Sequence, residues 1–587
     1  MPPITTIVLA LVPLMVITYL MVIQFWPATR AMPVAWVVAL AVGYFGWDMS
    51  PRWLAGATIN GFITALAILW IVFGAILLLY TLKETGAFDV INRGFASISD
   101  DRRVQVVVLV FLMCSFMEGA AGFGTPAAVV GPLLVGLGFP PLAAVVIALT
   151  GNLMAITFGA VGTPLVIGMQ DTLESVSMVK TQVVVNGPFG SISLWVDQIA
   201  VWAATYHAIV GIAVPIMGVM MMTRFFGEER SIRPAFAVLP LALFSWVTFV
   251  IPYWLTAYYL GPEFPALLGS MVAMVLTIGA LKAGYFHPDD DWEFAPRDTW
   301  PSHWVGGIEP GESVGQGGQI AADGGTVTSS NTALADDDGM SIWMAWLPYG
   351  LLAVLLVLTR VWAPLTDFLQ STLVLQWNNI LGTGLDNSIS VLYLPGAVFV
   401  FVHFTAVLLH RLGNLGRIPT DIKNSWAETF ERIAPPLVAL LFAVGTVQIM
   451  LQSGAATGGD SMLIVLSKAV AGVAGGTYPF FAAFVGAFGA FLAGSNTVSD
   501  ILFGTFQFGV ARDIGVSRTL LLAAQAVGGA IGNLIAIHNV VAALAVVGLV
   551  GEEGRVIRLE LIPLIYYGVF TGILSLLFVY VLFPGVF

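Results

Sequence analysis

Charged residues and cysteines are scarce in this sequence. Only 10% of its 587 residues are charged, whereas a soluble domain carries roughly a quarter. The one cysteine, Cys114, excludes a disulfide within the chain and a zinc site made of thiolates. The six histidines are scattered, and no metalloprotease, nucleotide-binding or nucleophile-elbow motif appears. These absences argue against a soluble protein and against the enzyme classes that those motifs mark.

Long apolar runs take the place of the missing charge. Hydrophobic residues make up 58% of the chain, and the mean hydropathy is +0.92. Runs such as 4–23, 57–82 and 561–583 reach the ~20 residues that span a bilayer. We therefore predict an all-α polytopic protein of the cell membrane, with about 12–14 spans. No basic residue precedes the first run, which favours a retained helix over a cleaved signal peptide.

Most of the net charge of −12 comes from one segment. Residues 285–340 hold eleven acidic residues and one basic residue, Arg297, among many Gly, Ser and Thr. Such a segment cannot bury a core, so we predict a disordered loop between two membrane halves, 1–284 and 341–587. Acidic charge repels nucleic acid, which excludes that partner. Basic stretches at 83–103, 224–233 and 411–432 are predicted to be cytoplasmic loops.

Two short stretches interrupt the apolar sequence in corresponding places. Glu118–Ala128 reads EGAAGFGTPAA, and Gly494–Thr505 reads GSNTVSDILFGT. A helix in hydrocarbon satisfies its own backbone, so a break needs protein or water around it, and paired breaks point to a transporter binding site. We predict hairpins near 118–136 and 494–512 that enter the membrane without crossing it and whose tips meet.

An internal repeat accompanies the two stretches. Gly151–Thr157 reads GNLMAIT and Gly532–His538 reads GNLIAIH, with five of seven positions identical. Each copy follows an interrupted stretch, which favours duplication. The second copy lies in a long apolar run, 519–550, that we predict to be broken at Gly528-Gly529 and at Gly532-Asn533.

The breaks suit a small oxygen-rich anion. Free N–H groups and the helix dipole at a helix N-terminus bind carboxylates, and hydroxyls and amides add neutral hydrogen bonds. Packing through small residues is the alternative, and we favour it for 119–121. Asn152 and Asn533, at the breaks of the repeat, suit capping as well as ligand contact. The predicted substrate contacts are Gly122, Gly124, Thr125, Asn152, Ser495, Asn496, Thr497 and Asn533.

Glu118 and Asp500 are the acids that we place within the membrane. Such groups mark proton or ion paths, although either acid could instead lie at a hairpin end in the interface. Loss of water at Glu118 favours the neutral acid. An ionised Glu118 would repel a substrate carboxylate, so proton and anion should bind together, which is symport by linkage. Asp500 could carry a proton in the same way or bind sodium.

These motifs resemble those of the L-lactate permease family, whose members also take glycolate. EGAAGFG at Glu118–Gly124 and LLVGLGF at Leu133–Phe139 match its first signature, and GSNTVSDILF at Gly494–Phe503 is similar to its second, GSDTSSNALF. FGAVGTP at Phe158–Pro164 and GPEFP at Gly261–Pro265 also agree. The resemblance covers most of the chain except the acidic segment.

The resemblance implies a proton-coupled importer of L-lactate or a related 2-hydroxy monocarboxylate. It also implies inverted repeats with paired re-entrant hairpins, and a carboxylate site at Ser495-Asn496-Thr497. Asn496 and Asp500 exchange the amide and acid that the family usually has there. Asn533 stands where the family commonly has a lysine, so His538 is a candidate substitute for that cation. A histidine hydrogen-bonded in the helix packing is an equal alternative.

Three other readings of the sequence remain. A sodium-coupled carrier of another small carboxylate would use the same broken helices. An ion channel would show rings of like residues around a pore, and a membrane-embedded enzyme would show a nucleophile–base pair or a metal cluster. Two dissimilar broken stretches favour a transporter, without a cofactor, over both of these classes.

Overall fold

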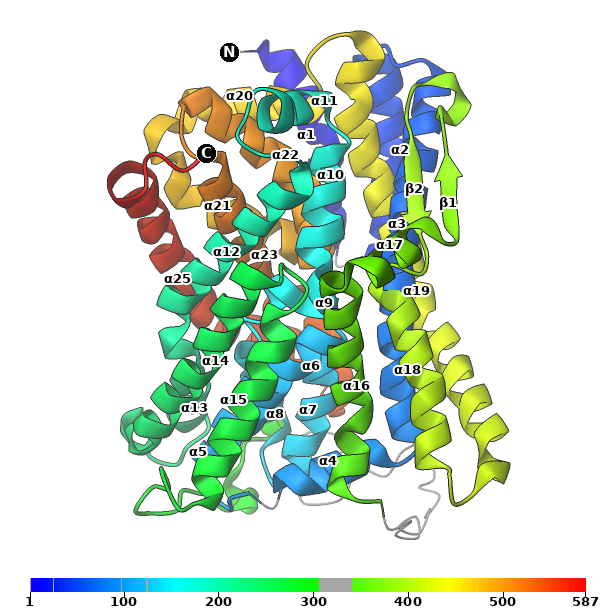
Figure 1. Cartoon of the computed structure of the whole chain (residues 1–587). Coiled ribbons are helices and arrows are strands. Elements are labelled where there is room, and N and C mark those ends of the chain that lie inside the picture. The colour runs from blue at the N-terminus through cyan, green and yellow to red at the C-terminus, as the bar shows by residue number, and fades with distance from the viewer. Residues whose placement is uncertain (1, 25, 97, 123–124, 306–339, 550) are drawn as a thin grey trace.

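The computed structural model describes residues 2–24, 26–96, 98–122, 125–305, 340–549 and 551–587, and these are almost entirely helical (Figure 1). Within these ranges, 11 helices are long and apolar enough to cross a membrane, or 12 when one bent pair counts as a span. The predicted all-α polytopic membrane architecture is therefore confirmed.

The helices before the acidic segment are α1 (Ile4–Thr18), α2 (Ala28–Gly46), α3 (Pro51–Glu84), α4 (Ala87–Ala96), α5 (Arg102–Gln105), α6 (Cys114–Ala120), α7 (Thr125–Gly136), α8 (Pro141–Gly151), α9 (Gly159–Thr163), α10 (Thr172–Glu174), α11 (Ser177–Lys180), α12 (Ile192–Val210), α13 (Val214–Phe225), α14 (Leu239–Tyr259) and α15 (Pro265–Lys282). A π-helical stretch, Val106–Met113, joins α5 to α6.

The elements after the acidic segment are α16 (Ile342–Val361), α17 (Ala363–Ser371), β1 (Val374–Trp377), β2 (Asn387–Ser390), α18 (Pro395–His410), α19 (Ile418–Thr457), α20 (Met462–Ala474), α21 (Tyr478–Ala493), α22 (Asn496–Ile514), α23 (Arg518–Asn533), α24 (Ile537–Ala545) and α25 (Glu553–Leu577). The strands form a small antiparallel hairpin in which Val374 pairs with Ser390.

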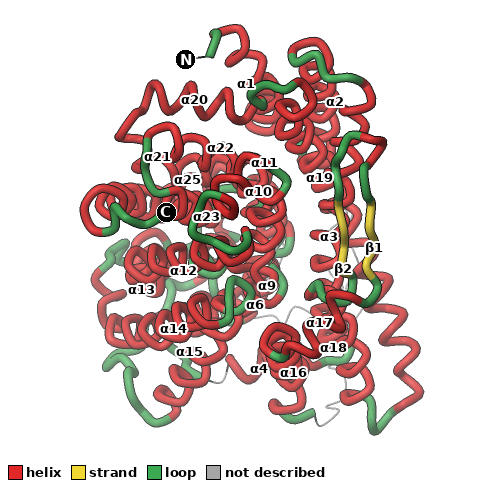
Figure 2. Tube along the Cα trace, turned by 45° about the horizontal axis from the view of Figure 1, so that its top comes forward, coloured by secondary structure: helices red, strands yellow, loops and turns green. Residues whose placement is uncertain are grey.

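The helices form two groups (Figure 2). In one group, α3 packs along α19, with α2 and α18 against the same pair. In the other group, α21, α22 and α23 pack on one another and α23 packs on α12, while α14 packs on α15 and α15 on α6. Each group therefore mixes helices from both sides of the acidic segment. Whether the two sides are repeats is not tested by this packing.

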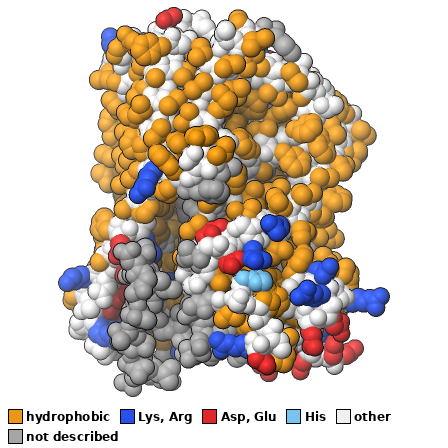
Figure 3. Space-filling model, turned by 180° about the vertical axis from the view of Figure 1, so that it is seen from behind, with side chains coloured by type: hydrophobic (Ala, Val, Ile, Leu, Met, Phe, Trp, Pro, Cys, Tyr) orange, Lys and Arg blue, Asp and Glu red, His pale blue; other side chains and the backbone are white. Residues whose placement is uncertain are grey.

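The surface has the character of a membrane protein. The rear face is covered by hydrophobic side chains over its upper part, and charged side chains gather toward its lower end (Figure 3). The basic loops lie at this lower end, where Arg411 Nη2 donates to Glu84 O and Arg103 Nη1 donates to Pro234 O. The third basic stretch is partly helical, because α19 already begins at Ile418.

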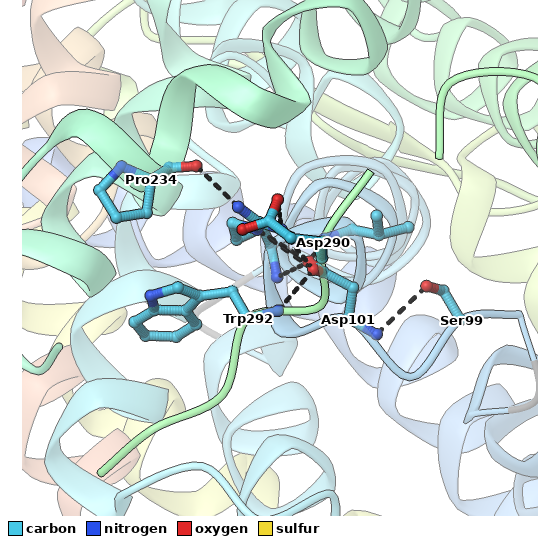
Figure 4. Close-up of polar contacts among 7 residues, drawn as sticks. Ser99, Asp101, Pro234, Asp290 and Trp292 are labelled. Carbon is cyan, nitrogen blue, oxygen red and sulfur yellow. Dashed lines mark hydrogen bonds and ion pairs between the residues drawn. The ribbon is translucent and has the colours of Figure 1, made fainter. Parts of the chain in front are cut away.

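The first part of the acidic segment lies against this end of the molecule (Figure 4). Asp101 caps α5, accepts from Arg103, and accepts a hydrogen bond from Trp292 N at 2.9 Å. Arg103 also pairs with Asp290 at 3.3 Å. Residues 285–305 therefore include a docked segment. The prediction of a disordered loop stays a prediction for residues 306–339, which lie outside the described residues.

One predicted helix break is wrong. Gly528 and Gly529 lie inside α23, which continues to Asn533. These glycines serve close packing: a Cβ at Gly528 would overlap the Ala483 carbonyl, and a Cβ at Gly529 would overlap the Asn496 side chain. The break after Asn533 is found where it was predicted, because α24 begins only at Ile537.

Candidate functional site

Both interrupted stretches turn at a glycine with left-handed backbone. α6 ends at Ala120 and is followed by Gly122 at φ +64°, and α21 ends at Ala493 and is followed by Gly494 at φ +64°. Glycine adopts this conformation without the steric cost that a Cβ adds, which is why it terminates helices. A Cβ at Gly122 would also lie 2.8 Å from the Ala160 Cβ. The two turns therefore need glycine for local reasons.

α21 and α22 form an antiparallel hairpin. Ser499 Oγ donates to Gly486 O at 2.7 Å, and farther from the turn Tyr478 OH donates to Gln507 Oε1 at 2.8 Å. The helices on either side of the first turn, 102–120 and α7, also pack on each other. The predicted ranges 118–136 and 494–512 thus contain the turns but leave out most of the helix that precedes each turn. Re-entry into the membrane stays a prediction.

The two turns line one cavity. Its walls are Glu118, Gly122, Ile156, Gly159, Ala160, Pro164, Gly494, Ser495, Asn496, Thr497 and Asn533. About 20 Å³ of it is open to a water-sized sphere, roughly the room that one ordered water needs. A 2-hydroxy carboxylate is larger than water, so the cavity is closed to it in this conformation. The predicted meeting of the tips is found, with six predicted site residues in the walls.

Glu118 is buried at the edge of this cavity. Its side chain accepts a hydrogen bond from Asn152 Nδ2 at 3.2 Å on Oε2. A Cβ at Gly159 would lie 2.6 Å from its Oε1, so a glycine there makes room for the carboxyl group. Among the described residues, no basic side chain lies within ion-pair distance of Glu118. The carboxyl group therefore faces the cavity with a neutral amide as its partner.

A left-handed turn forms the wall opposite the first tip. Ala160 and Val161 have φ values of +44° and +54°, and Gly162 follows at +72°. This conformation costs a residue with a Cβ roughly 1–2 kcal/mol, and such strain gathers at functional sites. Thr163 Oγ1 donates to Ala160 O at 2.5 Å and closes the turn. The FGAVGTP motif therefore builds a strained wall of the cavity.

The second tip presents the N-terminus of α22. Ser495 precedes the helix without a side-chain cap, so the first N–H groups of α22 are left for another acceptor. Asn496 Nδ2 donates to Ala526 O at 3.1 Å, and its buried Oδ1 has no hydrogen-bond partner. Thr497 is buried beside Gly168. Uncapped N–H groups, a hydroxyl and an amide together suit an anion.

The other predicted site residues lie elsewhere or outside the description. Asp500 is fully buried one turn beyond Asn496 and does not line the cavity; Gln525 Nε2 lies 3.4 Å from its Oδ1. Asn152 stands behind Glu118, whereas Asn533 reaches the cavity and accepts from Asn539 Nδ2 at 2.6 Å. Gly124 and the side chains of Thr125 and His538 lie outside the described residues.

Two buried groups were missed by the sequence reasoning. Glu560 of α25 is fully buried and contacts Thr150. His207 lies between Tyr567 OH, at 2.6 Å from Nδ1, and Thr157 Oγ1, at 2.8 Å from Nε2. A single acid at the head of a long apolar run was the available signal for Glu560, because ionisable groups in spans are rarely idle.

The sequence of the whole chain decides its family. The model of the family described as L-lactate permease matches residues 6–582. The chain belongs to the L-lactate permease family. It is therefore a multi-pass membrane transporter and not an enzyme, as predicted.

Three relatives are similar to this chain over most of their length. A putative L-lactate permease of Haemophilus influenzae is 27% identical, covering 97% of this chain and 98% of that protein. An L-lactate permease of Bacillus subtilis is 28% identical, covering 89% and 86%. The glycolate permease GlcA of Escherichia coli is 29% identical, covering 93% and 90%.

One solved structure is also similar. The YdaH transporter of Alcanivorax borkumensis is 14% identical, with a TM-score of 0.47, covering 94% of this chain and 98% of that chain.

Proposed function

We propose that this chain imports L-lactate or a related 2-hydroxy monocarboxylate such as glycolate, together with protons. The single observation that carries the proposal is the cavity where both tips meet, with Glu118 in one wall and the uncapped N-terminus of α22 in another. The names of the relatives supply the substrate class, since they are lactate and glycolate permeases.

The geometry supports a division of roles between the two tips. The α22 N–H groups, with Ser495 and Thr497, would bind the substrate carboxylate, because a helix N-terminus stabilises negative charge. Hydroxyl and amide groups, including Asn496 and Asn533, would hydrogen-bond the 2-hydroxyl. Glu118 would bind the proton, because a second ionised carboxyl in this small space repels the substrate.

Coupling follows from linkage between the two ligands. A proton on Glu118 removes the repulsion and so raises the affinity for the anion, and by reciprocity the anion raises the affinity of Glu118 for its proton. The cavity has room for about one water, so a wall must move before the substrate enters. Only a cavity that holds both substrate and proton, or neither, would close and then open to the other side of the membrane. This restriction is the condition for symport.

The test is uptake of labelled lactate into proteoliposomes under separately imposed proton and sodium gradients, with glycolate, pyruvate and succinate as competitors. The wild-type protein should accumulate lactate with the proton gradient alone. Glu118→Gln, which mimics the protonated acid, should still exchange lactate across the membrane but lose accumulation. Accumulation by Glu118→Gln with the wild-type pH dependence would move the coupling role to Asp500.

A sodium-coupled carrier is the second candidate, favoured by two orphaned oxygens. Asn496 Oδ1 and Asp500 Oδ2 are buried on α22 without hydrogen-bond partners, and residues four apart share a helix face. Hard cations prefer such oxygen ligands. Accumulation that follows the sodium gradient and is lost in Asp500→Asn would establish this alternative and refute proton coupling.

A further inference from the structure

Glu560 is a fully buried acid that the proposed mechanism does not use. It lies near the start of α25, and its partner is the hydroxyl of Thr150, 3.2 Å from each carboxyl oxygen. Thr150 Oγ1 also lies 3.1 Å from Val146 O. A hydroxyl has one hydrogen to share, so from the side chains that the structure describes an ionised Glu560 would receive at most one hydrogen bond. Because a buried carboxylate needs several donors, the neutral acid fits this position.

Thr150 belongs to the segment that also orients Glu118. α8 ends at Gly151, and the chain bends by 63° before it continues at Ile156. Thr150 contacts Glu560, and Asn152, two residues on, donates to Glu118. Between them, Gly151 packs so closely that a Cβ there would overlap Val110, which lies on the same helical stretch as Glu118. The three residues thus connect the two acids through one tightly packed bend.

We propose that Glu560 is a positioning residue that sets the pH range in which Glu118 couples proton and substrate. This inference rests on the proposed function. Neutral Glu560 holds Thr150 in place and keeps the Asn152 amide on Glu118. When Glu560 loses its proton, its carboxylate draws the Thr150 hydrogen away from Val146 O, and the end of α8 shifts. Because Gly151 is packed tightly against Val110, the bend moves as a unit, and the shift of Thr150 also moves Asn152.

No other titratable side chain that the structure describes is hydrogen-bonded to Glu560. α8 carries none in its sequence, and the side chain of His538 on α24 is not described. Of the described side chains, only Thr150 makes a hydrogen bond or ion pair with Glu560. The long helices packed against α25 are α12, α21 and α23. Their titratable groups, with those of α25 itself, are Asp197, Tyr206 and His207 on α12, Tyr478 on α21, Arg518 on α23, and Glu553, Arg555, Arg558, Tyr566 and Tyr567 on α25.

The experiment is the pH profile of lactate exchange in proteoliposomes at equal pH on both sides. Glu560→Gln cannot ionise, so the Asn152 amide stays on Glu118 at every pH. An amide N–H stabilises an ionised carboxyl group more than a neutral one, so exchange should end at a pH lower by roughly one unit than in the wild type, a coupling of common size. Glu553→Gln, a half-buried acid at the start of the same helix, is the matched control and should keep the wild-type profile. A wild-type profile in Glu560→Gln would overturn the inference.

A second pair of variants keeps the inference testable if Glu560→Gln fails to insert. Thr150→Val removes the hydroxyl and should move the alkaline limb of the profile to lower pH. Thr150→Ser keeps a hydroxyl and should show the wild-type profile. Unchanged profiles in both variants would overturn the inference. Failure of the proposed function looks different: the wild-type protein itself would then accumulate neither lactate nor glycolate under a proton gradient.

Discussion

The variant Gly159→Ala should change the orientation of the Glu118 side chain and leave the stability of the fold nearly unchanged. Gly159 has φ −65° and ψ 156°, a conformation that alanine adopts freely. The new methyl group would lie 2.6 Å from Glu118 Oε1, and the flexible carboxyl group is what must give way. Replacing glycine by alanine at a compatible site stabilises by roughly 0.4–1 kcal/mol through the unfolded chain. The variant should therefore insert and unfold much like the wild type.

Transport by Gly159→Ala should fall although the fold is kept. Displacing the carboxyl group breaks its hydrogen bond from Asn152, at 3.2 Å, and a hydrogen bond to a carboxyl group in its ionised state contributes roughly 1.5–3 kcal/mol. Each 1.4 kcal/mol is about tenfold, so proton-driven lactate accumulation should fall by at least about tenfold.

The assay measures initial uptake under a proton gradient beside thermal unfolding of the purified protein. Gly131→Ala is the matched control, because a Cβ at Gly131 of α7 meets only Val547 at an ordinary 3.7 Å. Normal accumulation by Gly159→Ala, with the wild-type pH dependence, would refute the role given to the Glu118–Asn152 contact. Equal losses of uptake in both variants would show a general effect of the methyl group.

Two further predictions concern the acidic segment and its anchor. Arg103→Ala leaves Asp101 buried without its cation, which should cost about 3–5 kcal/mol; thermal unfolding measures the loss, and unchanged unfolding would contradict it. Deleting residues 306–339 with a short flexible linker should leave uptake near normal. A deletion that begins at 289 should instead lower stability, because it removes Asp290, which pairs with Arg103 at 3.3 Å. Loss of uptake by a correctly inserted 306–339 deletion would show that the segment has a role in transport.

The membrane architecture and both turns were predictable because they depend on local patterns. Apolar runs of bilayer length define the spans, and glycine between them marks the left-handed turns at Gly122 and Gly494. The roles of other glycines depend on tertiary contacts. Gly528 reads like a helix break in the sequence, but it lies inside α23, where α21 approaches its backbone.

The placement of the acids was less predictable for the same reason. Asp500 belongs to the second signature, yet it lies one helical turn beyond Asn496, where it contacts Gln525 and does not line the cavity. Glu560 lies in no motif, and its importance depends on a contact with Thr150, 410 residues earlier in the chain. Sequence spacing says nothing about such a contact. The hydrogen bond from Asn152 to Glu118, over 34 residues, was hidden in the same way.

The positions of the two acids make their roles separable by a double-mutant cycle. Glu118 lines the cavity, where we propose that it acts on the substrate directly, whereas Glu560 lies outside the cavity and is proposed to act through Thr150. If Glu560 works only by orienting Glu118, its substitution has nothing left to alter once Glu118 is glutamine. The pH profile of exchange by Glu118→Gln/Glu560→Gln should therefore equal that of Glu118→Gln alone, a non-additive result expected for residues in one network. A further shift of the profile in the double variant would show that Glu560 reaches the substrate by a route that does not pass through Glu118.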